Sequence, residues 1–208
     1  MLLKSMVFVT PWFSMILVIL LSFGEALGQA PHMAWKTVYS LEHEHQIVKD
    51  SLLTTIPKLA QEWRLSFEAN PSEFTKFGSV LHMTIGGRGG KVGDRTPAIW
   101  FHKTKGILVS IALGGRASYN KYFHPLPTVG QWTKFEFSQS LVKSQSMFNI
   151  TIDGKNVFFR ENSKPVELEN VKVFSGNPWN APQKGSMRNL TIEMNTPPPC
   201  VPPGKHFF

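Results

Sequence analysis

The acidic residues best spaced for chemistry are two pairs of glutamates, Glu42 with Glu44 and Glu167 with Glu169. Residues two apart on a β-strand point to the same face, so each pair could present two carboxyl groups side by side. A retaining glycosidase uses two such groups about 5–5.5 Å apart, one as nucleophile and one as acid and base. Solvated charges on a strand face or in a loop have the same spacing, and that is the interpretation we favour.

The run GGRGGKVGDR, residues 86–95, has the glycines and the lysine of a phosphate-binding loop. A P-loop, however, needs a Ser or Thr directly after its lysine at the start of a helix, and Lys91 is followed by Val92. We therefore predict a loop between two strands. Within it, Asp94 is expected either to accept hydrogen bonds from loop amides or to pair with Arg95.

His43 and His45 flank Glu44, and alternate positions on a strand would place both imidazoles on one face. Such a pair could contribute to a zinc or copper site, but two histidines alone seldom hold a metal, so we predict a solvated polar face. Cys200 lies among prolines without an ordered base beside it, which argues against a cysteine nucleophile. We name no catalytic residue and expect a protein that is not an enzyme.

Basic residues outnumber acidic ones by 22 to 14, which gives a formal net charge of +8. Many of the cations lie between residues 88 and 121. If the loops that carry them share one rim, they form a positive surface that attracts sulfated or acidic polymers. The alternative is a surface that serves only solubility. The candidate rim residues are Arg88, Lys91, Arg95, Arg116 and Lys121.

The first 28 residues have the pattern of a secretory signal peptide. Lys4 precedes an apolar stretch, residues 12–23, and the small residues Ala26 and Gly28 stand where a signal peptidase cuts, which predicts a mature chain from Gln29. The alternative is an uncleaved anchor, but the stretch is shorter than the roughly 20 residues that cross a hydrocarbon core. We predict a secreted, extracellular product without stable membrane insertion and without a nucleic-acid partner.

Two sequons predict N-glycosylation, at Asn149 and at Asn189. Asn70 is excluded because a proline follows it. Asn149 and Asn189 are both out of phase with their apolar neighbours, so we expect both side chains to face solvent.

Cys200 is the only cysteine, so no disulfide can form within the chain. In an oxidising compartment an odd cysteine predicts a disulfide-linked partner. The alternative is a chain that continues into a further cysteine-bearing module. The surrounding residues 196–208 are rich in proline and predict an extended tail.

From Trp63 to Thr191, apolar and polar residues alternate in short segments that end at Gly, Pro, Asn or Asp. This pattern predicts an all-β, antiparallel, two-sheet sandwich. In VLHMTIGG, Leu81, Met83 and Ile85 share one predicted face. The predicted core residues are Trp63, Phe67, Ile99, Phe135, Ile150, Ile152, Val173 and Ile192.

Three segments need separate interpretation because other signals accompany the alternation. Residues 29–61 fit either a helix or strands, and we favour strands because Pro57 would interrupt a helix. Asp153-Gly154 predicts a tight hairpin, since both residue types accept a positive φ. Trp132 is out of phase with the alternation of the strand that follows it, which predicts either a bulge after Trp132 or a tryptophan on the opposite face.

The order of the segments resembles the concanavalin A-like lectin/glucanase superfamily, and its laminin-G-like and pentraxin-like branches look most similar. The resemblance covers roughly residues 35–195 and rests on a Trp at a strand start (EWRLSFEANP), an I-D-G hairpin (FNITIDGKNV) and a closing strand (VKVFSG). It implies a jelly roll of two curved sheets. Similar modules occur in secreted invertebrate proteins, including coral skeletal organic matrices, which implies a link to biomineralisation.

The resemblance also bears on cofactors and catalysis. Relatives often bind calcium through loop carboxylates, and of the three aspartates in the mature chain Asp94 is the candidate calcium ligand. We expect no other cofactor. The E-x-D-x-x-E run of the superfamily's retaining glycosidases does not occur, which argues against hydrolysis.

The predicted organisation is a signal peptide (1–28), a jelly-roll domain (29–195) and a proline-rich tail (196–208). The leading hypothesis is a secreted, non-enzymatic binding module that engages extracellular glycans or matrix proteins. A structural organic-matrix protein of a mineralised skeleton is the alternative, although mineral-binding proteins are usually acidic. A glycoside hydrolase is the third hypothesis.

Overall fold

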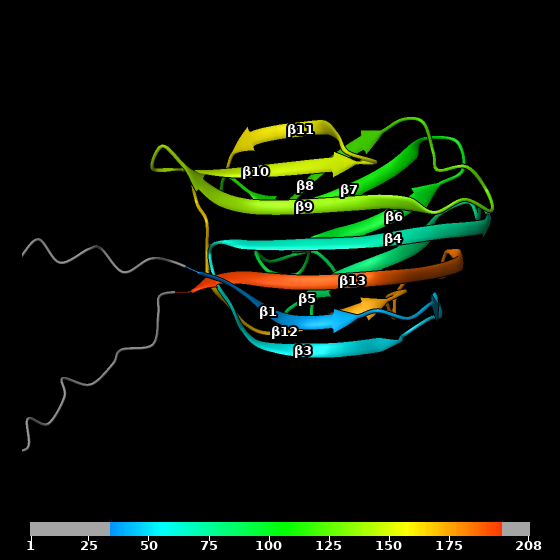
Figure 1. Cartoon of the computed structure of the whole chain (residues 1–208), viewed down its shortest axis with the longest axis horizontal. Coiled ribbons are helices and arrows are strands. Elements are labelled where there is room, and N and C mark those ends of the chain that lie inside the picture. Colours follow the sequence, from blue (N-terminus) through cyan, green and yellow to red (C-terminus); the bar gives the residue numbers. More distant parts are fainter. Residues whose placement is uncertain (1–33, 197–208) are drawn as a thin grey trace, which may run out of the picture. The chain divides into compact units, whose positions relative to one another are not determined.

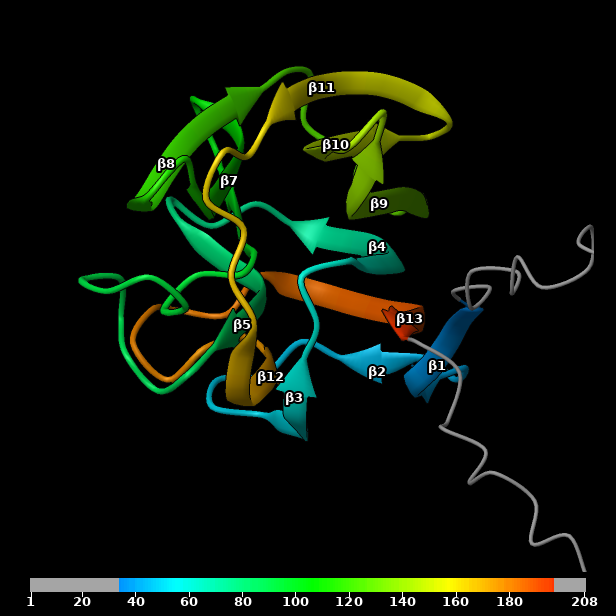
Figure 2. The ribbon, with the colours of Figure 1, turned by 90° about the vertical axis from the view of Figure 1, so that its left-hand side faces the viewer.

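The computed structural model describes residues 34–196, which form thirteen β-strands and no helix (Figure 1). Within this range, accordingly, there is no helix long and apolar enough to span a membrane. The strands make two antiparallel sheets that pack face to face, as predicted (Figure 2). The predicted signal peptide, Cys200 and the tail from residue 197 onward lie outside the described residues.

Sheet A has the strand order β1-β13-β4-β9-β10-β11, with β2 paired to β13. Its strands are β1 (Ala34–Leu41), β2 (His45–Gln46), β4 (Trp63–Glu73), β9 (Thr133–Val142), β10 (Gln145–Ile152), β11 (Lys155–Glu161) and β13 (Lys184–Thr196). Sheet B has the order β3-β12-β5-β6-β7-β8. Its strands are β3 (Leu52–Leu59), β5 (Gly78–Thr84), β6 (Ala98–His102), β7 (Gly106–Leu113), β8 (Arg116–Phe123) and β12 (Leu168–Ser175).

The core lies between the inner faces of the two sheets, because the alternation along each strand sends one set of side chains inward. Phe135 of β9 stacks on Phe67 of β4, with ring centroids 5.2 Å apart, and lies 5.9 Å from Phe101 of β6 in the other sheet. Seven of the eight predicted core residues are buried. Ile152 is the exception: it is partly exposed because β10 ends there at the hairpin turn.

The N-terminal segment forms strands, as predicted. Pro57 lies inside β3, which is an edge strand of sheet B, and an edge is where a residue without an amide hydrogen is tolerated. The Asp153-Gly154 hairpin is also confirmed, with positive φ at both residues (46° and 75°). Asp153 Oδ1 accepts a hydrogen bond from the Lys134 amide (2.8 Å), so its carboxylate is committed to the turn.

Trp132 lies on the opposite face from the core, which was one of the two predicted alternatives. The next residue, Thr133, is buried, and β9 pairs with β4 without a register shift. The Arg188 guanidinium lies 4.1 Å from the centre of the Trp132 ring, on the outer side of sheet A. This cation–π contact gives the displaced indole a partner outside the core.

Ile85 corrects one predicted face. Leu81 and Met83 are fully buried, whereas Ile85 is 38% exposed. The physical reason is that β5 ends at Thr84 and Gly86, with φ +125°, turns the chain into a loop. The apolar alternation in the sequence thus continues one residue beyond the end of the strand.

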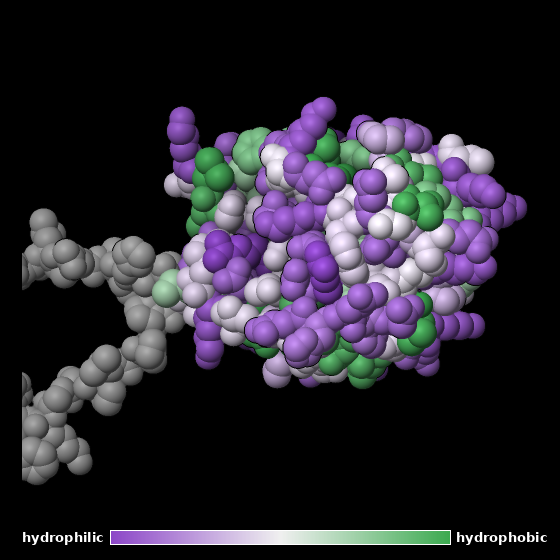
Figure 3. Space-filling model, turned by 45° about the vertical axis from the view of Figure 1, so that its right-hand side comes forward, coloured by the Kyte–Doolittle hydropathy of each residue, from purple (hydrophilic) through white to green (hydrophobic). Residues whose placement is uncertain are grey.

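The surface seen in Figure 3 is mainly hydrophilic, and its hydrophobic residues form small separate groups. That face therefore presents no wide apolar area.

Candidate functional site

The open edge of the sandwich lies between β8, the last strand of sheet B, and β11, the last strand of sheet A (Figure 2). Aromatic side chains link the two edges. The Phe158 ring of β11 lies 5.9 Å from the Tyr119 ring and 6.3 Å from the Phe123 ring, both on β8. Side chains from two strands that are distant in the sequence therefore meet along this edge.

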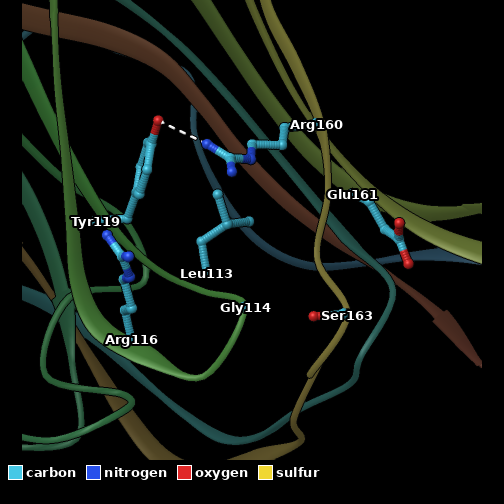
Figure 4. Close-up of a pocket in the computed structure, with 7 residues that line it drawn as sticks. All are labelled: Leu113, Gly114, Arg116, Tyr119, Arg160, Glu161 and Ser163. Carbon is cyan, nitrogen blue, oxygen red and sulfur yellow. Dashed lines mark hydrogen bonds between the residues drawn. The ribbon is translucent and has the colours of Figure 1, made fainter.

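A cleft of about 390 Å³ opens at one end of this edge, and we call it the edge cleft (Figure 4). The β7–β8 turn and β8 form one wall, and β11 with the segment after it forms the other. The lining residues are Leu113, Gly114, Arg116, Tyr119, Arg160, Glu161 and Ser163.

The walls of the edge cleft are held by a buried amide. Asn162, 3% exposed, accepts hydrogen bonds at Oδ1 from the amides of Gly114 (2.9 Å) and Lys164 (3.3 Å). Its Nδ2 donates to Gln139 Oε1 (2.6 Å). Gly114 and Gly115 both have positive φ (59° and 81°), as a two-residue hairpin turn of type I′ requires. The turn is thus fixed to the opposite wall before any ligand arrives.

The edge cleft carries two arginines. Arg160 Nη1 donates to the Tyr119 hydroxyl (3.0 Å), and its guanidinium lies 5.2 Å from the centre of that ring. Arg116 is exposed beside Tyr119, and neither arginine forms an ion pair with any residue in the range 34–196. Figure 4 shows the Glu161 carboxylate pointing away from Arg160.

This arrangement suits an anion. Guanidinium groups donate paired hydrogen bonds to carboxylates and sulfates, and the hydroxyls of Tyr119 and Ser163 can add further bonds. Glu161 is the single acid among the lining residues, so the edge cleft lacks the second carboxyl group that glycoside hydrolysis requires.

The predicted rim residues fall into two groups. Arg88, Lys91 and Arg95 belong to the loop of residues 85–97, which follows β5. Arg116 lines the edge cleft, and Lys121 lies on β8. The Ser118 hydroxyl of β8 donates to the Gly89 carbonyl (2.9 Å), so the loop touches β8.

Arg160 was not among the predicted site residues, because it lies on another strand. One signal pointed to it: in KNVFFRE the alternation places Arg160 in phase with the core-facing Phe158. A cation at an inward-facing position is unusual on a strand whose inner face is buried. Its presence here indicates that this end of β11 lies at an edge of the sandwich that solvent reaches.

Arg95 is held inside the 85–97 loop. Its Nε donates to the Arg88 carbonyl (3.1 Å), Nη1 donates to Ser110 Oγ (3.3 Å), and the guanidinium lies 5.2 Å from the centre of the Trp100 ring. Burial, with a smaller effect from the Arg88 charge, lowers the pKa of Arg95. We assign Arg95 to the structure of the loop.

Asp94 is 4% exposed and accepts hydrogen bonds at Oδ2 from the amides of Gly89 (3.2 Å) and Lys91 (2.8 Å). This confirms the amide-accepting alternative, and no ion pair links Asp94 to Arg95 within the range 34–196. A side chain at Gly87 would collide with the same carboxylate.

The surroundings of Asp94 do not fit calcium. A calcium ion needs six to eight oxygen ligands, several of them acidic, and Asp94 is one carboxylate whose neighbours include cations. Among residues 34–196, no three His, Cys, Asp or Glu side chains are grouped to hold a metal. His45 Nε2 instead lies 3.2 Å from Ser51 Oγ, and His43 is exposed.

Both sequon asparagines belong to sheet A. Asn189 is exposed, has a positive φ (51°) at a register shift in β13, and donates to Glu68 (3.0 Å). Asn149 of β10 is half-buried, and its Nδ2 lies 3.3 Å from Thr151 Oγ1. Neither asparagine lines the edge cleft.

A second polar cluster lies on the outer side of sheet B, beneath two loops. His82 is fully buried, with Nε2 2.8 Å from the Asp94 carbonyl and Nδ1 3.0 Å from Asn177 Nδ2. The rings of Trp100 and Trp179 lie 5.6 Å and 5.3 Å from its ring. Burial lowers the pKa of His82 from 6.5 to about 4, so the ring is neutral and joins the 85–97 loop to the segment after β12.

No protein-family model matches the chain, and no curated protein matches its sequence. Solved structures share the fold. The CBM40 module of a Ruminococcus gnavus sialidase, bound to α2,3-sialyllactose, matches with a TM-score of 0.50 and 10% identity, over 73% of this chain and 91% of that one. The receptor-binding domain of botulinum neurotoxin D matches with a TM-score of 0.51 and 13% identity, over 81% of this chain and 43% of that one.

Mouse laminin α1 domains LG4-5 match with a TM-score of 0.49 and 16% identity, over 79% of this chain and 42% of that one. This chain therefore spans less than half the length of the neurotoxin and laminin structures. The likeness to the sialidase module and the neurotoxin domain shows the fold, an antiparallel jelly-roll sandwich of two sheets, as the sequence predicted.

Proposed function

We propose that this protein is a secreted, non-enzymatic module that binds an acidic glycan of the extracellular matrix in the edge cleft. The observation that carries the proposal is the meeting of Arg116 and Arg160, without carboxylate partners in the range 34–196, beside the hydroxyls of Tyr119 and Ser163. The Ruminococcus gnavus module, solved with sialyllactose, supports a glycan as ligand in this fold.

The two arginines supply affinity in different ways. Arg160 is already oriented by the Tyr119 hydroxyl, so little side-chain entropy is lost when it binds. Arg116 is exposed and adds a second fork of donors. The net charge of +8 raises the rate at which a polyanion meets the protein.

The absence of enzymatic activity is part of the proposal. Glu161 alone lines the edge cleft as an acid, and the sequence lacks the three-acid run of the retaining glycosidases. Secretion is supported by the signal-like N-terminus and by the sequons at Asn149 and Asn189.

A glycan array with neutral, carboxylated and sulfated glycans tests the proposal. We expect the protein to bind the acidic glycans alone. Arg116→Gln or Arg160→Gln should weaken this binding about 10- to 100-fold, since a hydrogen bond to a charged group contributes about 1.5–3 kcal/mol. Lys172→Gln on β12 is the matched control, because it removes the same charge from an exposed site on another strand. Binding of neutral glycans only, or equal weakening by Lys172→Gln, would refute the proposal.

A further inference from the structure

The open edge carries a second, larger cleft of about 770 Å³, where β8 ends and β11 begins. We call it the hairpin cleft, because the β10–β11 hairpin forms one side and the segment between β8 and β9 forms the other. Its polar and aromatic lining includes Tyr122, His124, Gln131, Trp132, Lys155 and Asn156.

The edge cleft and the hairpin cleft are two ends of one edge. Arg116, the first residue of β8, lines the edge cleft with Arg160 near the end of β11. Phe123, the last residue of β8, lines the hairpin cleft with Lys155, the first residue of β11. The strands thus run antiparallel past each other, and the eight residues of β8 span roughly 26 Å at 3.3 Å per residue.

Cations are spaced along this edge. Lys121 is exposed and in phase with Tyr119 and Phe123, which both contact Phe158, so it points toward β11. With Arg116, Lys155 and Arg160 it makes four positive side chains on two strands, and none of the four is in an ion pair with a residue of the described range.

The four cations along the edge outnumber its two acids, Glu161 and Asp153. β8 contains none, and the one acid of β11, Glu161, points away from Arg160 (Figure 4). Asp153 lines the hairpin cleft, where its carboxylate keeps its charge while it accepts the Lys134 amide hydrogen, so the edge as a whole stays positive.

We infer that the two clefts and the cations between them form one extended groove for a linear acidic polysaccharide, whose repeated carboxylate or sulfate groups bind along the edge. This inference rests on the proposed function and names its ligand class. The Tyr119–Phe158 contact closes the sandwich between the clefts, so the polymer lies across the outside of the edge. Tyr122, 38% exposed, offers a sugar ring an apolar face in the hairpin cleft.

An extended groove has a consequence that a single anion site lacks. Once one repeat is bound in the edge cleft, the next repeats are held at high effective concentration near Lys121 and Lys155. Affinity must therefore rise with chain length until the polymer reaches the hairpin cleft.

Titration calorimetry with size-fractionated sulfated uronate oligosaccharides, from disaccharide to decasaccharide, tests this. We expect affinity per oligosaccharide to rise at least about tenfold across the series. The Lys121→Gln/Lys155→Gln double variant should bind the disaccharide as the wild type does. It should lose most of the increase in affinity that longer oligosaccharides give. The Lys49→Gln/Lys172→Gln variant, with two exposed lysines removed elsewhere, should keep the gain.

Three other outcomes would refute either the groove alone or the groove together with the proposed function. Wild-type affinity that does not depend on length, with loss of binding in Arg160→Gln, refutes the groove and leaves the proposed function intact. Equal weakening by both double lysine variants refutes it too, because the effect would then follow net charge alone. Absence of binding at every length refutes the groove and the proposed function together.

Discussion

Acidification should loosen the cluster around His82. The neutral ring makes both of its hydrogen bonds inside the protein, to the Asp94 carbonyl and to the Asn177 amide. The Asn177 side chain also accepts bonds at Oδ1 from the amides of Trp179 and Asn180 (3.0 and 2.8 Å), which orients its NH₂ as a donor to His82. A protonated ring would carry a hydrogen on Nδ1 as well, so two donors would face each other at the Asn177 NH₂. The folded state therefore disfavours protonation of His82.

The size of the expected loss of stability follows from the pKa of His82, which is lowered from 6.5 to about 4. Between these values the unfolded chain binds the proton and the folded chain does not, so acid favours unfolding. The contribution of His82 to stability is complete above pH 6.5 and is lost as the pH falls to 4. At about 1.36 kcal/mol per pKa unit, the full loss is about 3 kcal/mol, of which roughly 2 kcal/mol occurs between pH 7 and pH 4.5.

Urea unfolding followed by far-UV circular dichroism, at pH 7, 6, 5 and 4.5, measures this loss. The free energy of unfolding of the wild type should fall roughly 2 kcal/mol more than that of His82→Gln over this range. His43→Gln, at an exposed position before β2, should follow the wild type. Parallel pH profiles of wild type and His82→Gln would refute the reasoning, as would an NMR titration in which the His82 ring takes its proton near pH 6.5.

Three further predictions concern the core, the 85–97 loop and the sequons. Phe135→Ala should cost about 3–5 kcal/mol in urea unfolding, whereas Phe159→Ala, 56% exposed, should cost less than about 0.5 kcal/mol; similar costs would mean that the core is misassigned. Asp94→Ala should lower the free energy of unfolding by about 1–3 kcal/mol, because it leaves the Gly89 and Lys91 amides unpaired. Neither calcium nor a chelator should change the melting temperature of the wild type. A rise in melting temperature with calcium would contradict the structural role of Asp94. Mass spectrometry of the protein should find glycans on Asn149 and Asn189. Removal of these glycans should leave acidic-glycan binding intact, since neither residue lines the edge cleft, and a bare Asn189 would contradict the sequon prediction.

The fold could be predicted because its signals are local. Alternation over a few residues identifies a buried strand face, and an Asp-Gly pair specifies its own turn. The prediction was wrong at Ile85 and Ile152, because periodicity does not say where a strand ends. Ile152 is the last residue of β10, and Ile85 lies one residue beyond the end of β5.

The candidate site was predicted in part. The cations between residues 88 and 121 predicted a positive surface that includes Arg116. Its pairing with Arg160 depends on β8 and β11 being the last strands of different sheets. That order follows from pairings between distant segments, which no local pattern encodes. His82 shows the same limit: it lies in the polar phase of β5 and is buried only because two loops cover the outer side of sheet B.

The most direct test of the edge cleft is an NMR titration of the arginine side-chain Nε–Hε signals with a sulfated uronate disaccharide. The signals of Arg116 and Arg160 should shift together and saturate. Those of Arg64 and Arg188 should stay in place, because each is already in an ion pair, with Glu193 and with Glu68. Shifts at Arg64 and Arg188 equal to those at Arg116 and Arg160, or no shift at Arg160 in a bound protein, would contradict the proposal.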